Sequence, residues 1–174
     1  GLPGQAQAST RSLKAFDENR KAIDSASAGK TDDSRKRFAD ALTADPDSAE
    51  IVHNQGVLQL QEKKLKEAID LFESSAKQAG QSEQYDLQAR SLYDLGIAKS
   101  AGEDRNGAAD AYIRALESLR KAPDEKLEAM VRHNLELLFK KQNGGGKDDK
   151  DKKDDKKDDK RDQSKSDSKS DQKN

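Results

Sequence analysis

The chain has 174 residues, enough for one domain and a tail, but only 31% of them are hydrophobic and 39% are charged. This balance excludes a single thick hydrophobic core. The 33 Lys and Arg residues are matched by 34 Asp and Glu residues, so no excess of positive charge is present and nucleic acid is not an expected partner. The absence of cysteine excludes disulfides, a thiolate nucleophile and a Cys-based zinc site.

The first ten residues are small and polar, and we expect residues 1–10 to be disordered. The chain opens with Gly1 rather than Met, and Ala6-Gln7-Ala8 would suit a signal-peptidase site. We therefore expect a mature form from which a targeting segment was removed. No apolar run approaches the ~20 residues of a membrane-spanning helix, so contact with a membrane is not expected.

The region that follows has the spacing of helices. From Ser12 to Gln142, apolar residues recur at helical intervals between short stretches of Gly, Asp, Pro or Ser, and nothing alternates with the period of a strand. The pattern predicts seven helices joined by short turns. They cover residues 11–28, 32–44, 48–62, 65–79, 83–101, 105–121 and 125–142.

Two glycines mark a repeat, because each is followed after 12 residues by an alanine and after 16 residues by an aromatic residue. The two sets are Gly56, Ala68 and Phe72, and then Gly96, Ala108 and Tyr112. Small residues let the two helices of a hairpin approach closely, and we expect the aromatic rings to fill the space between one hairpin and the next. The repeat predicts a string of helical hairpins.

These residues resemble the signature of the tetratricopeptide repeat (TPR), in which Leu-Gly in the first helix precedes an alanine and an aromatic residue in the second. The resemblance covers about residues 15–142, although the first unit matches only from Phe38 onward. It implies an all-α, TPR-like α-solenoid of about three helical hairpins plus a closing helix, within a domain of residues 11–143. The period is 34 residues between the first two units and 40 afterwards, so extra residues near 80–88 are expected to lengthen a helix or loop.

A narrower resemblance lies at the end of the last helix. His133-Asn134-Leu135-Glu136 and the polar tail are similar to the C proteins of the bacterial Bat (aerotolerance) operon. That resemblance implies a periplasmic scaffold in a bacterium, with a von Willebrand A-type domain protein as a partner. Without it, a cytoplasmic location would be expected.

The last segment, residues 144–174, is a low-complexity tail. After the three glycines 144–146 it contains 11 Lys and Arg residues against 10 Asp residues. Such a sequence buries no apolar surface, so we expect a disordered, solubilising extension. Contact with a charged partner or anionic lipid, or calcium binding by the paired Asp residues, is the alternative.

No catalytic, metal-binding or cofactor-binding site is predicted. His53 and His133 lie at the same register of different units, so neither belongs to a cluster with metal-ligand spacing. The glycines 144–146 precede charged residues rather than a helix, which indicates a linker and not a phosphate-binding loop. Carboxylates at the turns are expected to cap helices. The sequence therefore predicts a binding protein and not an enzyme.

The candidate binding residues lie on the first helix of each unit. Asn54 and Asp94 stand two residues before a repeat glycine, and Asn134 is their equivalent in the last unit. The TPR resemblance implies that this register faces a concave groove, where Asn side chains can hydrogen-bond a peptide backbone. The predicted groove consists of Asn19, Arg20, His53, Asn54, Val57, Arg90, Tyr93, Asp94, Ile97, His133 and Asn134. A merely solvated inner face is the alternative.

The function expected from these residues is that of an adaptor or scaffold that binds a protein or peptide partner in the groove. Only Arg20 and Arg90 supply fixed positive charge near it, so we expect an internal segment rather than a C-terminal carboxylate. The alternative is a self-assembling structural protein that forms homo-oligomers through the solenoid ends. There Leu127, Met130 and Leu138 are expected to be partly uncovered.

Overall fold

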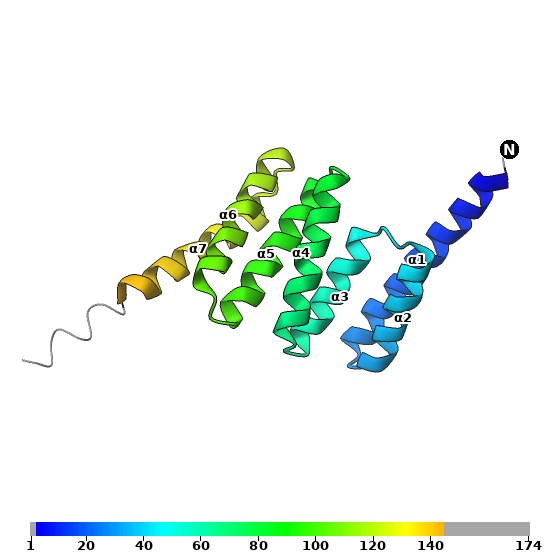
Figure 1. Cartoon of the computed structure of the whole chain (residues 1–174), viewed down its shortest axis with the longest axis horizontal. Coiled ribbons are helices and arrows are strands. Elements are labelled where there is room, and N and C mark those ends of the chain that lie inside the picture. The colour runs from blue at the N-terminus through cyan, green and yellow to red at the C-terminus, as the bar shows by residue number, and fades with distance from the viewer. Residues whose placement is uncertain (1–2, 145–174) are drawn as a thin grey trace, which may run out of the picture. The chain divides into compact units, whose positions relative to one another are not determined.

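The structure is a computed structural model that describes residues 3–144, and within them it contains seven α-helices and no strand (Figure 1). The helices are α1 (Pro3–Ser27), α2 (Thr31–Ala44), α3 (Ala49–Gln61), α4 (Leu65–Gln81), α5 (Tyr85–Ala101), α6 (Arg105–Lys121) and α7 (Glu125–Gly144). The predicted all-α class is confirmed. In the part of the chain that is described, no helix is both long and apolar enough to cross a bilayer.

Neighbouring helices pair as hairpins. α1 packs on α2, α3 on α4 and α5 on α6, and α4 also packs on α5, so the second and third hairpins are joined (Figure 1). The apolar interior is divided accordingly. One cluster runs from α4 through α7, and a second joins α1, α2 and the buried face of α3. Each hairpin therefore buries its apolar surface against its neighbours, as expected for a helical-repeat protein without one thick core.

The helix boundaries differ from the predicted ones at both ends of the domain. α1 begins at Pro3, so a helix covers residues 3–10, for which we expected disorder. Proline suits a first helical position because its missing N–H would have no partner there, and the Ala and Gln residues that follow are good helix formers. α7 continues to Gly144. The remainder of the predicted tail lies outside the described residues.

The longer repeat period is taken up by longer helices. α4 and α5 each have 17 residues, whereas α2 has 14 and α3 has 13. The expectation that extra residues near 80–88 lengthen a helix is thereby confirmed.

Aromatic rings of the second helices lie on the repeat glycines of the first helices. A Cβ atom added to Gly56 would lie 2.7 Å from Cε1 of Phe72, and one added to Gly96 would overlap the ring of Tyr112. Phe72 is 0% exposed and Tyr112 is 2% exposed. We expected these rings to fill the space between hairpins. Both rings do belong to a core cluster that extends into the next unit, and each also closes its own hairpin from within, because a glycine leaves room for a ring on the facing helix.

Four turns contain a residue in the left-handed region of φ. They are Gly29 at 74°, Lys63 at 61°, Glu83 at 57° and Glu103 at 63°. These turns follow α1, α3, α4 and α5, where the sequence predicted helix breaks. Only the first turn uses glycine, so the other three have a strained backbone that costs roughly 1 kcal/mol per residue.

We expect Gly56→Ala to lower the free energy of unfolding by about 1–2 kcal/mol. Because Phe72 is enclosed and cannot move aside, overpacking against it should cost roughly 2–3 kcal/mol, the upper part of the usual range, and the higher helix propensity of Ala offsets about 1 kcal/mol of it. Gly102→Ala is the control, because its new Cβ would meet no atom closer than 3.6 Å. Urea denaturation of both variants tests the contact, and equal stability of Gly56→Ala and the parent would contradict it.

The turn strain predicts a stabilising change. Glu103→Gly should raise the free energy of unfolding by up to about 1 kcal/mol, because glycine adopts positive φ without a steric penalty. Glu117→Gly, at an exposed site within α6, is the matched control and should lower stability by about 1 kcal/mol. Thermal melting compares the two, and a loss of stability in both variants would show that the turn at Glu103 is unstrained.

Candidate functional site

Equivalent positions on the first helices can be counted from the residue at the repeat glycine. This reference residue is Ala22 in α1, Gly56 in α3, Gly96 in α5 and Glu136 in α7, in keeping with the periods of 34 and 40 residues. The position of a residue is its number of residues before (−) or after (+) the reference residue of its helix, so that His53 is at position −3 and Asn54 at position −2.

Hydrogen bonds join each first helix to the next at the predicted groove register. Asn54 Nδ2 donates to Asn19 Oδ1 over 3.1 Å, and His53 Nε2 lies 2.8 Å from Asp94 Oδ2. The third bond runs from Asn134 Nδ2 to the hydroxyl of Tyr93 over 3.4 Å. Every bond connects position −3 of one helix to position −2 of the following one. We call these six residues, Asn19, His53, Asn54, Tyr93, Asp94 and Asn134, the polar ladder.

His53 is an internal member of the ladder. It is 7% exposed, and its ring lies 5.7 Å from that of Phe72 between centroids. Nε2 faces Asp94, and Nδ1 lies 3.4 Å from Asn54 Oδ1, so both ring nitrogens face oxygen atoms of neighbouring side chains. Sequence reasoning placed this ring on the groove surface, whereas here it connects α3 to α5. Its burial follows from the close packing around Phe72.

Tyr93 and Asn134 repeat this arrangement one unit later. The ring centroids of Tyr93 and Tyr112 are 6.1 Å apart, and Asn134 Nδ2 also lies 3.4 Å from the Tyr112 hydroxyl. Burial raises the pKa of Tyr112, and the hydrogen bond from Asn134 acts in the opposite direction. Phe72 and Tyr112 therefore each support a ladder residue on the first helix of their own hairpin.

The other predicted groove residues lie outside the ladder. Arg20 is exposed and pairs with Asp17 and Asp24 of its own helix at 3.3 and 3.9 Å. Arg90 and His133 are exposed, and Val57 and Ile97 are half-buried. The structure thus brings six of the eleven predicted residues into one hydrogen-bonded row and leaves five beside it.

Val57 and Ile97 belong to a longer row that sequence reasoning missed. They stand at position +1, where α1 has Ile23, 42% exposed, and α7 has Leu137, 43% exposed. We call Ile23, Val57, Ile97 and Leu137 the apolar row. Position +1 is three residues after −2 and four after −3, so both rows share a helix face, called here the first-helix face. The 34- and 40-residue spacings applied to Val57 and Ile97 would have found the missing members.

Position −6, seven residues before the apolar row, lies on the same face. There α1 has Phe16, 68% exposed, and α7 has Met130, 40% exposed, whereas α3 and α5 have the exposed Glu50 and Arg90. Sequence reasoning assigned Met130 to an uncovered solenoid end. Its register places it on the first-helix face instead.

The outer side of α1 is charged at two positions that are each apolar in one interior first helix. Asp17 and Lys21 hold the positions of Ile51 and Leu95, which are 3% and 0% exposed. Lys21 Nζ pairs with Asp17 over 2.6 Å. A hydrated ion pair therefore takes the place of apolar contacts on this side of the first helix.

A similar exchange occurs on α7. Arg132, with a side chain 65% exposed, stands where Leu92 is buried in α5, and Glu136 replaces the repeat glycine. Leu127 and Leu138, which we expected to be partly uncovered, are only 9% exposed because they pack on the core shared with α6. Both ends of the repeat array thus present charged residues, as terminal repeats do when they face solvent, but each end also has an exposed apolar residue beside the charges, Leu13 at 68% and Phe139 at 51%.

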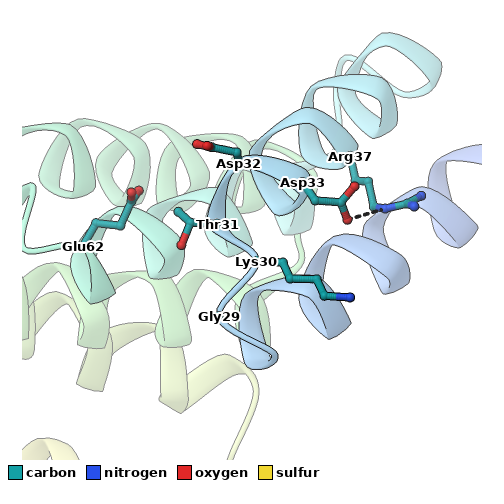
Figure 2. Close-up of a pocket in the computed structure, with 7 residues that line it drawn as sticks. All are labelled: Gly29, Lys30, Thr31, Asp32, Asp33, Arg37 and Glu62. Carbon is teal, nitrogen blue, oxygen red and sulfur yellow. Dashed lines mark hydrogen bonds and ion pairs between the residues drawn. The ribbon is translucent and has the colours of Figure 1, made fainter.

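Two pockets lie away from the first-helix face. One has a volume of about 630 Å³ and is lined by Gly29, Lys30, Thr31, Asp32, Asp33, Arg37 and Glu62 (Figure 2). Figure 2 shows Arg37 paired with Asp33, and Glu62 pairs with Arg35 over 2.8 Å. A hydrogen bond from Ser25 and the pairing with Arg37 lower the pKa of Asp33. These carboxylates already have partners within the protein.

The second pocket, of about 260 Å³, is lined by Gln88, Leu92, Arg114, Glu117, Ser118 and Lys121 of α5 and α6. Nothing in residues 3–144 groups three or more His, Cys, Asp or Glu side chains so that they could hold a metal ion. The first-helix face is therefore the candidate site, and its chemistry is that of recognition through hydrogen bonds and apolar contact.

The repeat register and the helix pairing agree with a known family. Residues 19–83 match the tetratricopeptide repeat family. The matched segment lies in the first two units. It includes most of the first unit, which matches the repeat signature less well than the second. Comparison with curated protein sequences found no match.

Solved structures share the tetratricopeptide fold at low sequence identity. The N-terminal domain of stress-induced protein-1 from C. elegans is 19% identical, with a TM-score of 0.61 over 71% of this chain and 96% of that chain. The TPR2B domain of yeast Sti1, in a complex with pHsp70, is 12% identical, with a TM-score of 0.66 over 75% and 99%. The first TPR domain of Spaghetti, bound to the HSP90 peptide SRMEEVD, is 19% identical, with a TM-score of 0.59 over 74% and 95%. The predicted TPR-like solenoid is confirmed.

The ladder predicts that its asparagines stabilise the fold. Asn54→Ala should lower the free energy of unfolding by about 1 kcal/mol, because it removes the bond to Asn19 and an acceptor facing His53. Asn106→Ala, at an exposed site of α6, is the control and should change stability by less than about 0.5 kcal/mol. Urea denaturation measures both, and equal effects would show that the ladder contributes nothing to stability.

Proposed function

We propose that this protein is an adaptor that binds a segment of a protein or peptide partner on the first-helix face. The observation that carries the proposal is the placement of exposed apolar residues. Of the large apolar residues exposed on the two outermost first helices, Phe16, Ile23, Met130 and Leu137 fall at positions −6 or +1 of this face. Leu13, at −9, and Phe139, at +3, are also exposed and fall at neither position. Exposed apolar residues gathered on one face are typical of interaction surfaces.

The polar ladder supports the same proposal. Each Asn side chain has two N–H donors and an oxygen with two lone pairs, which is more than the ladder bonds of Asn54 require. The half-buried Asn54 and Asn134 can therefore bond a ligand backbone while they hold neighbouring helices together. Because the ladder already fixes these side chains, less conformational entropy would be lost on binding.

Proteins of the same fold also support a peptide as the ligand. The Spaghetti domain holds an HSP90 peptide, and the yeast Sti1 domain is in a complex with pHsp70. For this chain, a von Willebrand A-type domain partner and a periplasmic location stay predictions from the resemblance to the Bat operon C proteins.

The alternative, self-assembly through the solenoid ends, is opposed by the charges at those ends. Stacking would bring Asp17, Lys21, Arg132 and Glu136 out of water, and desolvating charged groups costs free energy that pairing seldom returns in full. Light scattering at increasing protein concentration tests the alternative directly, and we expect a constant mass equal to one chain.

Binding on the first-helix face predicts where a ligand can be cross-linked. Peptides selected from a random display library against the full chain should cross-link to a photoreactive residue at position 90, on this face. They should not cross-link to one at position 113, which is also exposed but lies on α6. Mass spectrometry of the products identifies the site, and cross-links confined to position 113 would move the binding surface to the second helices.

The contribution of the ladder can be measured with the same peptides. Calorimetric titration of Asn54→Ala/Asn134→Ala, after melting has shown that it is folded, should give binding weaker by about 1–3 kcal/mol than the parent. Asn106→Ala is the control and should bind as the parent does. Unchanged affinity in the double variant would remove these two asparagines from the binding site.

A further inference from the structure

The first-helix face, on which the proposed function rests, also indicates what kind of segment it accepts. Its apolar row supplies one aliphatic side chain from every first helix, so a segment that crosses the helices meets Ile23, Val57, Ile97 and Leu137 in succession. Phe16 and Met130 extend the apolar surface at the two outermost helices. A partner gains most from this face if it also presents apolar side chains at intervals.

The charges on the face are few and mostly engaged. The carboxylate of Asp94, in the middle of the ladder, is paired with His53, and Arg20 is paired with Asp17 and Asp24. At position −6, the exposed Glu50 and Arg90 have opposite signs. The face therefore has no cluster of unopposed cations that would attract a run of carboxylates.

We infer that the partner segment is anchored by a series of aliphatic or aromatic side chains and is not an acidic segment that ends in a free carboxylate. The apolar row supplies the attraction for such anchors along the whole face. The ladder beside it bonds the backbone between anchors. Neither row contains a lysine or arginine, so neither attracts an accumulation of negative charge.

Two synthetic peptide pools of equal length test this inference on the full chain. One pool has blocked termini and carries Leu, Ile or Phe among Ser, Asn and Gln. The other carries Asp and Glu at the same places and a free C-terminal carboxylate. With methyl-labelled Ile, Leu and Val, NMR should show the apolar pool shifting Ile23, Val57, Ile97 and Leu137. Ile113, 47% exposed on α6, is the internal control and should not move.

A matched pair of substitutions measures the contribution of one anchor. Ile23→Ser and Ile113→Ser replace the same residue type at sites of similar exposure, 42% and 47%, so neither should disturb the fold. We expect the Kd of the tightest apolar peptide to rise roughly tenfold in Ile23→Ser, the loss expected when an aliphatic contact is removed. It should be unchanged in Ile113→Ser. Equal Kd values in both variants would overturn the inference.

The outcomes separate this inference from the proposed function. If only the acidic pool shifts the face, the inference is overturned while binding on the first-helix face stands. If neither pool shifts it, the inference is again overturned, and cross-linking from position 90 decides the proposed function by itself. Shifts centred on Ile113 would overturn both.

Discussion

Contact between an aromatic ring and a helical glycine holds this structure together in its second and third hairpins. Phe72 and Tyr112 occupy space that any side chain at Gly56 or Gly96 would fill. The two helices of each hairpin can therefore approach until a ring lies on the backbone. Because proteins pack their interiors at nearly crystalline density, a ring enclosed in this way fixes the separation and stagger of its two helices.

The same rings connect the fold to the candidate site. Phe72 lies beside His53, and Tyr112 lies beside Tyr93, so the ring that closes a hairpin also supports the residue that reaches to the next first helix. The ladder depends on that support, because a hydrogen bond of about 3 Å tolerates little movement of either partner. Packing within a hairpin and alignment between hairpins are thus parts of one arrangement.

Different parts of the surface of the repeat array carry charged residues and exposed apolar residues. At the two ends, charged residues such as Lys21 and Arg132 occupy positions at which an apolar side chain would need a further hairpin to cover it. Apolar residues remain exposed on the first-helix face of the same two helices. The charges at the ends oppose stacking of one chain on another, even though Leu13 and Phe139 are exposed beside them, and the first-helix face stays available for a partner.

The sequence by itself determined the seven helices, the repeat and the place of the glycines and their rings, because these follow from local spacing and residue size. The same spacing predicted that Asn54, Asp94 and Asn134 share a face. Only the tertiary structure decided that the residues of this face bond one another and that His53 is buried. Those bonds join residues 35 to 41 positions apart in the sequence, and each runs from position −3 of one first helix to position −2 of the next, an offset of one residue. That offset comes from the stagger of neighbouring hairpins, which packing sets and which no local pattern records.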